Sequence, residues 1–111
     1  MSQRIERINQ LLKQEISQSL LREIDFANTL VTITKVETSP DLRQAKVKIS
    51  VMPTEKSELA LEILEKNIYH LQQVLNKKLT MRITPKIRFI IDQTELKAQR
   101  IEEILEKVKR D

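Results

Sequence analysis

The chain has 111 residues, 40% of them hydrophobic and 32% charged, with a formal net charge of +4; this is the balance expected of one globular domain spanning residues 1–111. It contains no cysteine and no glycine, which excludes disulfides, thiolate metal sites and the glycine-rich loops that cradle phosphates. No apolar run reaches the roughly 20 residues that a membrane span requires, and the first residues lack the apolar stretch of a secretion signal, so we expect a cytoplasmic protein without membrane contact.

The first half of the chain predicts one helix and two strands. Apolar residues recur every three or four positions from Ile5 to Leu20, which indicates an amphipathic helix over roughly residues 2–23. The β-branched run at residues 30–37 indicates a strand, which must end in a turn at Pro40. From residue 44 to 51, apolar residues alternate with polar ones that include Lys46 and Lys48. This second strand therefore has one apolar and one basic face.

The second half predicts a helix, a strand and a final helix. Apolar residues keep a three-four spacing from about residue 55 to 79, and residues 81–91 alternate again. Pro85 lies inside that alternation, which favours an edge strand or a strand that begins after it. Asp92, with Glu95 three residues later, has the spacing of a capping box and predicts the start of a last helix. The fold class is therefore α+β, with a three-stranded sheet covered on one face by helices. Its element order matches the type of KH domain found in bacteria, although the G-x-x-G loop is missing.

Positive charge is concentrated in one segment. Residues 66–91 contain six basic side chains and no acidic one: Lys66, Lys77, Lys78, Arg82, Lys86 and Arg88. We expect them to form one patch beside Lys46 and Lys48, as phosphate binding would require. The alternative is an ordinary solvated face, and composition does not decide between the two.

Candidates for base stacking and for catalysis are few. Of the three aromatic residues, Phe26 and Phe89 are expected in the core, whereas Tyr69 could either stack on a base or cover the helix surface. His70 is the only histidine, so no histidine pair can hold a metal and no catalytic set emerges. Ser39 is expected to shape the turn. We therefore expect neither an enzyme nor a bound cofactor or metal.

Three separated segments resemble one known family. Residues 36–47 (V-E-T-S-P-D-L-R-Q-A-K-V), 81–89 (M-R-I-T-P-K-I-R-F) and 100–105 (R-I-E-E-I-L) are similar, in the same order, to the signatures of ribosome-binding factor A. The resemblance implies a KH-like, type II fold in which the middle helix is kinked. It also implies a non-catalytic monomer that binds the small ribosomal subunit and its rRNA and assists late maturation and processing of that rRNA. Where the family has A-x-G at the kink, this chain has Asn67-Ile68-Tyr69.

The sequence therefore gives a hypothesis for the RNA-binding site. Phosphate contacts are assigned to Arg4, Arg7, Lys46, Lys48, Lys77, Lys78, Arg82, Lys86 and Arg88, with Asn67 and Tyr69 at the helix bend. Two other functions stay open: a small protein–protein interaction domain, whose basic strip would meet acidic side chains, and a generic KH-like RNA-binding module.

Overall fold

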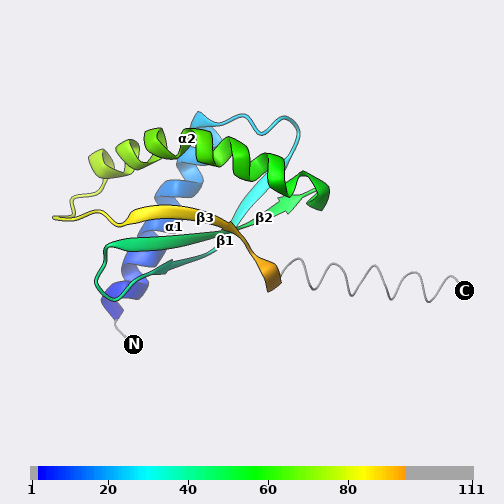
Figure 1. Cartoon of the computed structure of the whole chain (residues 1–111). Helices are drawn as coiled ribbons and strands as arrows, with labels where there is room; N and C mark the ends of the chain where they lie inside the picture. Colours follow the sequence, from blue (N-terminus) through cyan, green and yellow to red (C-terminus); the bar gives the residue numbers. More distant parts are fainter. Residues whose placement is uncertain (1–2, 95–111) are drawn as a thin grey trace, which may run out of the picture.

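The computed structural model describes residues 3–94, which form the predicted elements in the predicted order (Figure 1). These are α1 (Gln3–Glu23), β1 (Leu30–Thr38), β2 (Gln44–Met52), α2 (Ser57–Lys78) and β3 (Lys86–Ile91), with a short 3-10 helix, η1 (Thr54–Lys56), before α2. The expected final helix falls on residue 95 onwards, outside the described residues, apart from its first two residues, 93–94.

The three strands form one mixed sheet with β2 in the centre. β1 pairs with β2 in antiparallel orientation and β3 pairs with β2 in parallel orientation. β3 begins directly after Pro85 and lies at an edge of the sheet, so both expectations drawn from that proline are confirmed. The reason is that proline has no N–H to give to a sheet ladder.

A turn of hydrogen-bonded polar side chains joins β1 to β2. The Ser39 hydroxyl donates to Asp41 Oδ1 (2.6 Å) and accepts the Gln44 N–H (3.1 Å), while Asp41 Oδ1 also accepts the Arg43 N–H (3.1 Å). The two bonds that Asp41 accepts, first that from Ser39 and then that from Arg43, lower the pKa of its carboxyl. Leu42 takes the left-handed conformation (φ 63°) in this turn. A chain without glycine must place another residue there.

Both helices cover one face of the sheet and share a single core. The buried residues include Leu12 and Ile16 of α1, Val47 of β2 and Leu64 and Leu71 of α2, all at most 1% exposed. Two side-chain contacts join the helices: the ion pair between Lys78 and Glu15 (3.9 Å), and the contact between His70 Nε2 and Glu23 Oε2 (3.1 Å). Since residue numbers rise along one helix as they fall along the other, α1 and α2 are antiparallel.

The C-terminal end of β3 is fixed by Asp92. Its N–H donates to the Ile49 carbonyl (2.8 Å), and its carboxylate accepts the Thr34 hydroxyl (2.6 Å) and the Thr94 N–H (2.9 Å). The last bond is the N-cap contact that the sequence predicted for Asp92. The other half of the predicted capping box, Glu95, lies outside the described residues.

α2 is continuous through the segment where the resemblance implies a kink. Asn67, Ile68 and Tyr69 are all helical, and the Asn67 side-chain amide donates to the Ile63 carbonyl one turn earlier (2.7 Å). The replacement of A-x-G by these residues therefore leaves an unbroken helix.

Candidate nucleic-acid interface

Three of the predicted cations meet on the face of the sheet opposite α1 and α2. In β2, Lys46 lies between the buried residues Ala45 and Val47, so it points away from the helices. The parallel register places Lys46 opposite Arg88, and Lys86 precedes Arg88 by two residues on the same face of β3. We call Lys46, Lys86 and Arg88 the sheet cluster. All three side chains are exposed, and neighbouring strands lie only about 4.8 Å apart, so a polyanion could contact them together.

Lys48 lies on the same face, but its charge is partly offset. Its ammonium is 3.2 Å from the Glu37 carboxylate, which also pairs with Lys35 at 3.3 Å. The hydrogen bond from Lys48 is the main cause of the lowered pKa of Glu37; burial opposes it. Lys35 was not identified from the sequence as a site residue. Lys35 lies opposite Lys48 in the sheet, and β1 carries a bulge between Ile33 and Lys35. This bulge shifts the register of the strand, so the alternation of residues alone does not predict that pairing.

A cavity of about 360 Å³ adjoins the sheet cluster. It is lined by β2, β3 and one residue of α2: Gln44, Ala45, Lys46, Lys86, Ile87, Arg88 and Ile68. Ile68 is the central residue of the segment that stands where the family has A-x-G. The structure therefore brings that part of α2 together with the sheet cluster.

Gln72 of α2 holds the edge of β3 in place beside this cavity. Its side-chain carbonyl accepts the Ile87 N–H (2.9 Å), and its amide donates to the Pro85 carbonyl (3.0 Å) and to Asn76 Oδ1 (3.3 Å). Gln72 was not identified from the sequence, because nothing in its sequence context indicates that it faces the edge of a strand.

The other predicted cations lie on the layer of helices. Arg4 and Arg7 belong to α1, Lys77 and Lys78 to the last turn of α2, and Arg82 to the connection that follows. We call these five residues the helix cluster. Because Lys78, the last residue of α2, pairs with Glu15 of α1, the preceding turns of α1 that carry Arg4 and Arg7 extend beyond the end of α2. The predicted set of cations is thus divided between two layers.

The two remaining predicted site residues lie next to each other but differ in exposure. Tyr69 is 76% exposed, so its ring is available to a ligand. Asn67 is half-buried, and its amide bonds to Ile63 within the helix. Phe89 is buried (6% exposed) and Phe26 packs against the core, as the sequence predicted for both.

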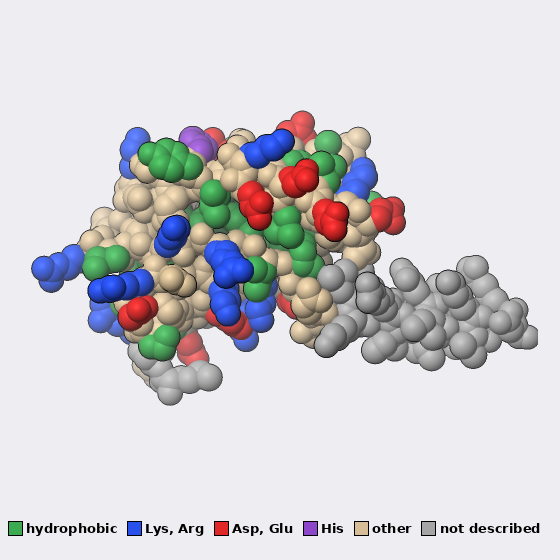
Figure 2. Space-filling model, viewed as in Figure 1, with side chains coloured by type: hydrophobic (Ala, Val, Ile, Leu, Met, Phe, Trp, Pro, Cys, Tyr) green, Lys and Arg blue, Asp and Glu red, His purple; other side chains and the backbone are tan. Residues whose placement is uncertain are grey.

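Charge is distributed unevenly over the molecular surface. Figure 2 shows Lys and Arg side chains over the left and lower parts of the visible face, and Asp and Glu side chains mainly over its upper right. The acidic part corresponds to the first half of α2, which carries Glu58, Glu62 and Glu65. The basic part corresponds to the starts of β3 and α1 in Figure 1.

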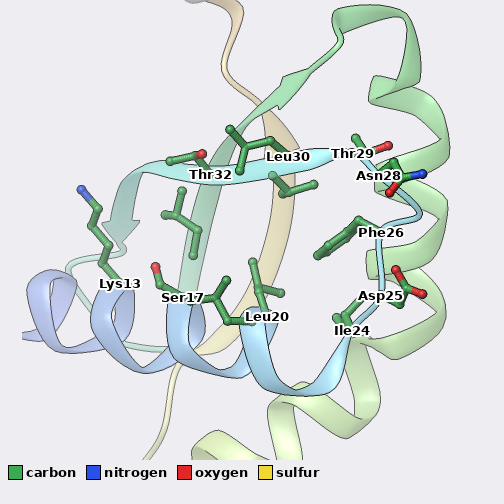
Figure 3. Close-up of a pocket in the computed structure, with 13 residues that line it drawn as sticks. Lys13, Ser17, Leu20, Ile24, Asp25, Phe26, Asn28, Thr29, Leu30 and Thr32 are labelled. Carbon is green, nitrogen blue, oxygen red and sulfur yellow. The ribbon is translucent and has the colours of Figure 1, made fainter.

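A second cavity, of about 560 Å³, lies between α1, the connection at 24–29 and β1 (Figure 3). Its walls are largely apolar, including Leu20, Ile24 and Phe26, whose ring points into it, while Lys13 lies at one end. Within residues 3–94 there is no group of three acidic, histidine or cysteine side chains that could hold a metal ion. Over the same residues, none of the helices combines the length and apolarity needed to span a bilayer.

Comparison with known proteins gives a consistent result. Residues 4–105 match the family model of ribosome-binding factor A. Ribosome-binding factor A of Halothermothrix orenii is 39% identical over 111 residues, which cover 98% of this chain and 91% of that protein.

Two structures from Thermus thermophilus share the fold. The crystal structure of ribosome-binding factor A superposes with a TM-score of 0.70 at 22% identity, over 78% of this chain and 93% of that one. A homology model fitted into a cryo-EM map of a 30S–ribosome-binding factor A complex gives 0.65 at 22% identity, over 77% and 91%. The match to the family model over nearly the whole chain, together with the KH-like topology, shows that this protein belongs to the ribosome-binding factor A family.

Proposed function

We propose that this protein binds the small ribosomal subunit through its rRNA and assists late maturation and processing of that rRNA. Two findings support the proposal: the chain belongs to a family named for ribosome binding, and a Thermus thermophilus protein of the same fold has been fitted into a map of a 30S complex. The protein acts as a cytoplasmic monomer, with residues 1–111 as one domain.

The observation that carries the proposal is the sheet cluster. Lys46, Lys86 and Arg88 are exposed, lie on adjacent strands, and have no ion-pair partner within residues 3–94. Cations held this way by a rigid sheet suit a phosphate backbone, since each phosphate that they neutralise releases counterions. Only one aromatic ring, that of Tyr69, is well exposed in the described part of the chain. Recognition therefore rests on the backbone and shape of the RNA more than on its bases.

Of the segment Asn67-Ile68-Tyr69, only Ile68 reaches the cavity beside the sheet cluster, whereas Tyr69 points away from the sheet. Ile68 lines the adjoining cavity and Tyr69 projects into solvent one residue later. Tyr69 stacks on an unpaired base in this proposal. Asn67 has a smaller role, because its amide is already bonded to the Ile63 carbonyl.

The protein performs no catalysis in this proposal. His70, its only histidine, lies on the surface beside Glu23 rather than in either cavity. The protein contributes to maturation through its free energy of binding, which favours one arrangement of the rRNA over others.

Sedimentation on a density gradient tests the proposal. We expect the protein to travel with small subunits, and ribonuclease treatment to release it. If the amphipathic helices docked a protein instead, the association would survive digestion of the RNA. A generic RNA-binding module would bind free RNA without preferring subunits.

A triple variant tests the contribution of the helix cluster. Changing Lys77, Lys78 and Arg82 to alanine should weaken binding to subunits and reduce the slope of log affinity against log salt by about 0.7–0.9 for each phosphate that the variant no longer neutralises. Unchanged affinity would remove these residues from the interface. Circular dichroism would verify that the variant is folded.

A further inference from the structure

The outer face of α2 is a second surface suited to RNA. Lys66, Tyr69 and Lys77 each lie two positions from a buried leucine of α2, which is about 200° around a helix. All three side chains therefore point away from the sheet, and all three are exposed. This face combines cations with the exposed aromatic ring, whereas the sheet cluster has cations alone.

The cations at the end of this face are available to a ligand. Within residues 3–94, Lys77 and Arg82 are exposed and have no ion-pair partner, whereas Lys78 pairs with Glu15. No acidic residue occurs between positions 66 and 91. The acidic side chains of α2 itself therefore lie in its first half, and the acidic neighbours of its second half are Glu15, which pairs with Lys78, and Glu23, which contacts His70.

The sheet cluster and the outer face of α2 face in opposite directions. The sheet cluster lies on the face of the sheet opposite α1 and α2, and the outer face of α2 lies beyond the helix that packs on the other side. A helix with its side chains is about 10–12 Å across, so a single phosphate cannot contact both surfaces.

We propose that one molecule holds two RNA segments at the same time, one on the sheet cluster and one on the outer surface formed by Tyr69, Lys77 and Arg82. This inference rests on the proposed function, because it requires that the protein bind RNA. It assigns a mechanical role to the fold: the rigid core between the two surfaces fixes the relative position of two rRNA segments.

A bridging experiment tests this proposal. One short RNA hairpin is immobilised, a second fluorescent hairpin is added in solution, and the protein is titrated between them. We expect the protein to capture the fluorescent RNA, and native mass spectrometry to show complexes of one protein with two RNAs. Capture should fall again when protein is in excess, because each RNA then occupies its own molecule.

Three matched double variants separate the surfaces. Lys86→Glu with Arg88→Glu alters the sheet cluster, Lys77→Glu with Arg82→Glu alters the outer surface, and Lys13→Glu with Arg22→Glu alters exposed cations outside both. Each double variant changes the net charge equally. We expect each of the first two variants to retain binding of one RNA but to reduce bridging at least tenfold. The third variant should bridge within about threefold of the wild type, because a change in net charge alone acts only weakly on either surface.

Several results would overturn the inference. Binding of RNA by the wild type without bridging would leave the proposed function intact and refute only the second surface. Bridging by a protein dimer, or bridging that survives Lys77→Glu with Arg82→Glu, would do the same. Absence of any RNA or subunit binding by the wild type would refute both proposals. Because glutamate is unfavourable at a helix C-terminus, Lys77→Gln with Arg82→Gln provides a second version of the outer variant.

Discussion

Gln72 should contribute measurably to stability because it supplies hydrogen bonds that the free edge of β3 otherwise lacks. In the variant Gln72→Ala, the Ile87 N–H loses its acceptor and the Pro85 carbonyl loses a donor. Ile87 is only 2% exposed. An unsatisfied buried donor costs about 1–3 kcal/mol, and the slightly better helix propensity of alanine offsets a few tenths. We expect a loss of about 2 kcal/mol in the free energy of unfolding.

Urea denaturation measures this loss directly. With a slope of about 2 kcal/mol per molar urea, the midpoint should fall by about 1 M. Gln73→Ala is the matched control, because Gln73 is the neighbouring residue of α2 and is exposed; its effect should stay within about 0.5 kcal/mol. Hydrogen exchange adds a local readout, since the Ile87 amide should exchange faster in Gln72→Ala.

Two results would refute this role of Gln72. If Gln72→Ala and Gln73→Ala destabilise the protein equally, the hydrogen bonds to β3 contribute nothing beyond helix propensity. If the Ile87 amide stays protected in Gln72→Ala, another group accepts its hydrogen bond. Since Lys86 and Arg88 flank Ile87, a loosened edge should also weaken RNA binding by the sheet cluster.

Three further predictions concern single residues. Hydrogen bonding from Ser39 lowers the pKa of Asp41, so its carboxylate contributes stability above the ordinary aspartate pKa of about 3.9. This stability is lost as the pH falls through the lowered pKa. Between pH 7 and pH 2, Asp41→Asn should therefore lose less stability in urea denaturation than the wild type does. Ala27 has a φ of 51°, so Ala27→Gly should stabilise the protein against thermal unfolding by about 0.5–1 kcal/mol. The control Ala60→Gly, inside α2, should destabilise it by about 1 kcal/mol or more. A loss of stability in Ala27→Gly would contradict the strained conformation of Ala27. Tyr69→Ala should leave the free energy of unfolding within about 0.5 kcal/mol but weaken RNA binding by about fivefold or more in a filter-binding assay, and unchanged affinity would show that no base stacks there.

Local patterns in the sequence were enough to predict the secondary structure of the described residues. Alternation in residues 44–51 and the three-four spacing in α1 and α2 report directly which residues meet the core, because each element has a fixed period. Pro40 and Pro85 set a turn and a strand start for reasons that act within one or two residues. The family resemblance also followed from local motifs, and it is confirmed.

Only the tertiary structure decided which charges lie together. The cations of residues 66–91 form one run in the sequence, but α2 and β3 lie in different layers, so Lys77 and Arg88 face in opposite directions. Lys46 and Arg88 are 42 positions apart in the numbering yet lie opposite each other, because parallel pairing of β2 with β3 depends on a crossover through α2. The hydrogen bonds of Gln72 to β3 arise in the same way. Periodicity determines which side of an element is apolar, but the assignment of a polar side chain to a particular neighbour depends on contacts between elements that are distant in sequence.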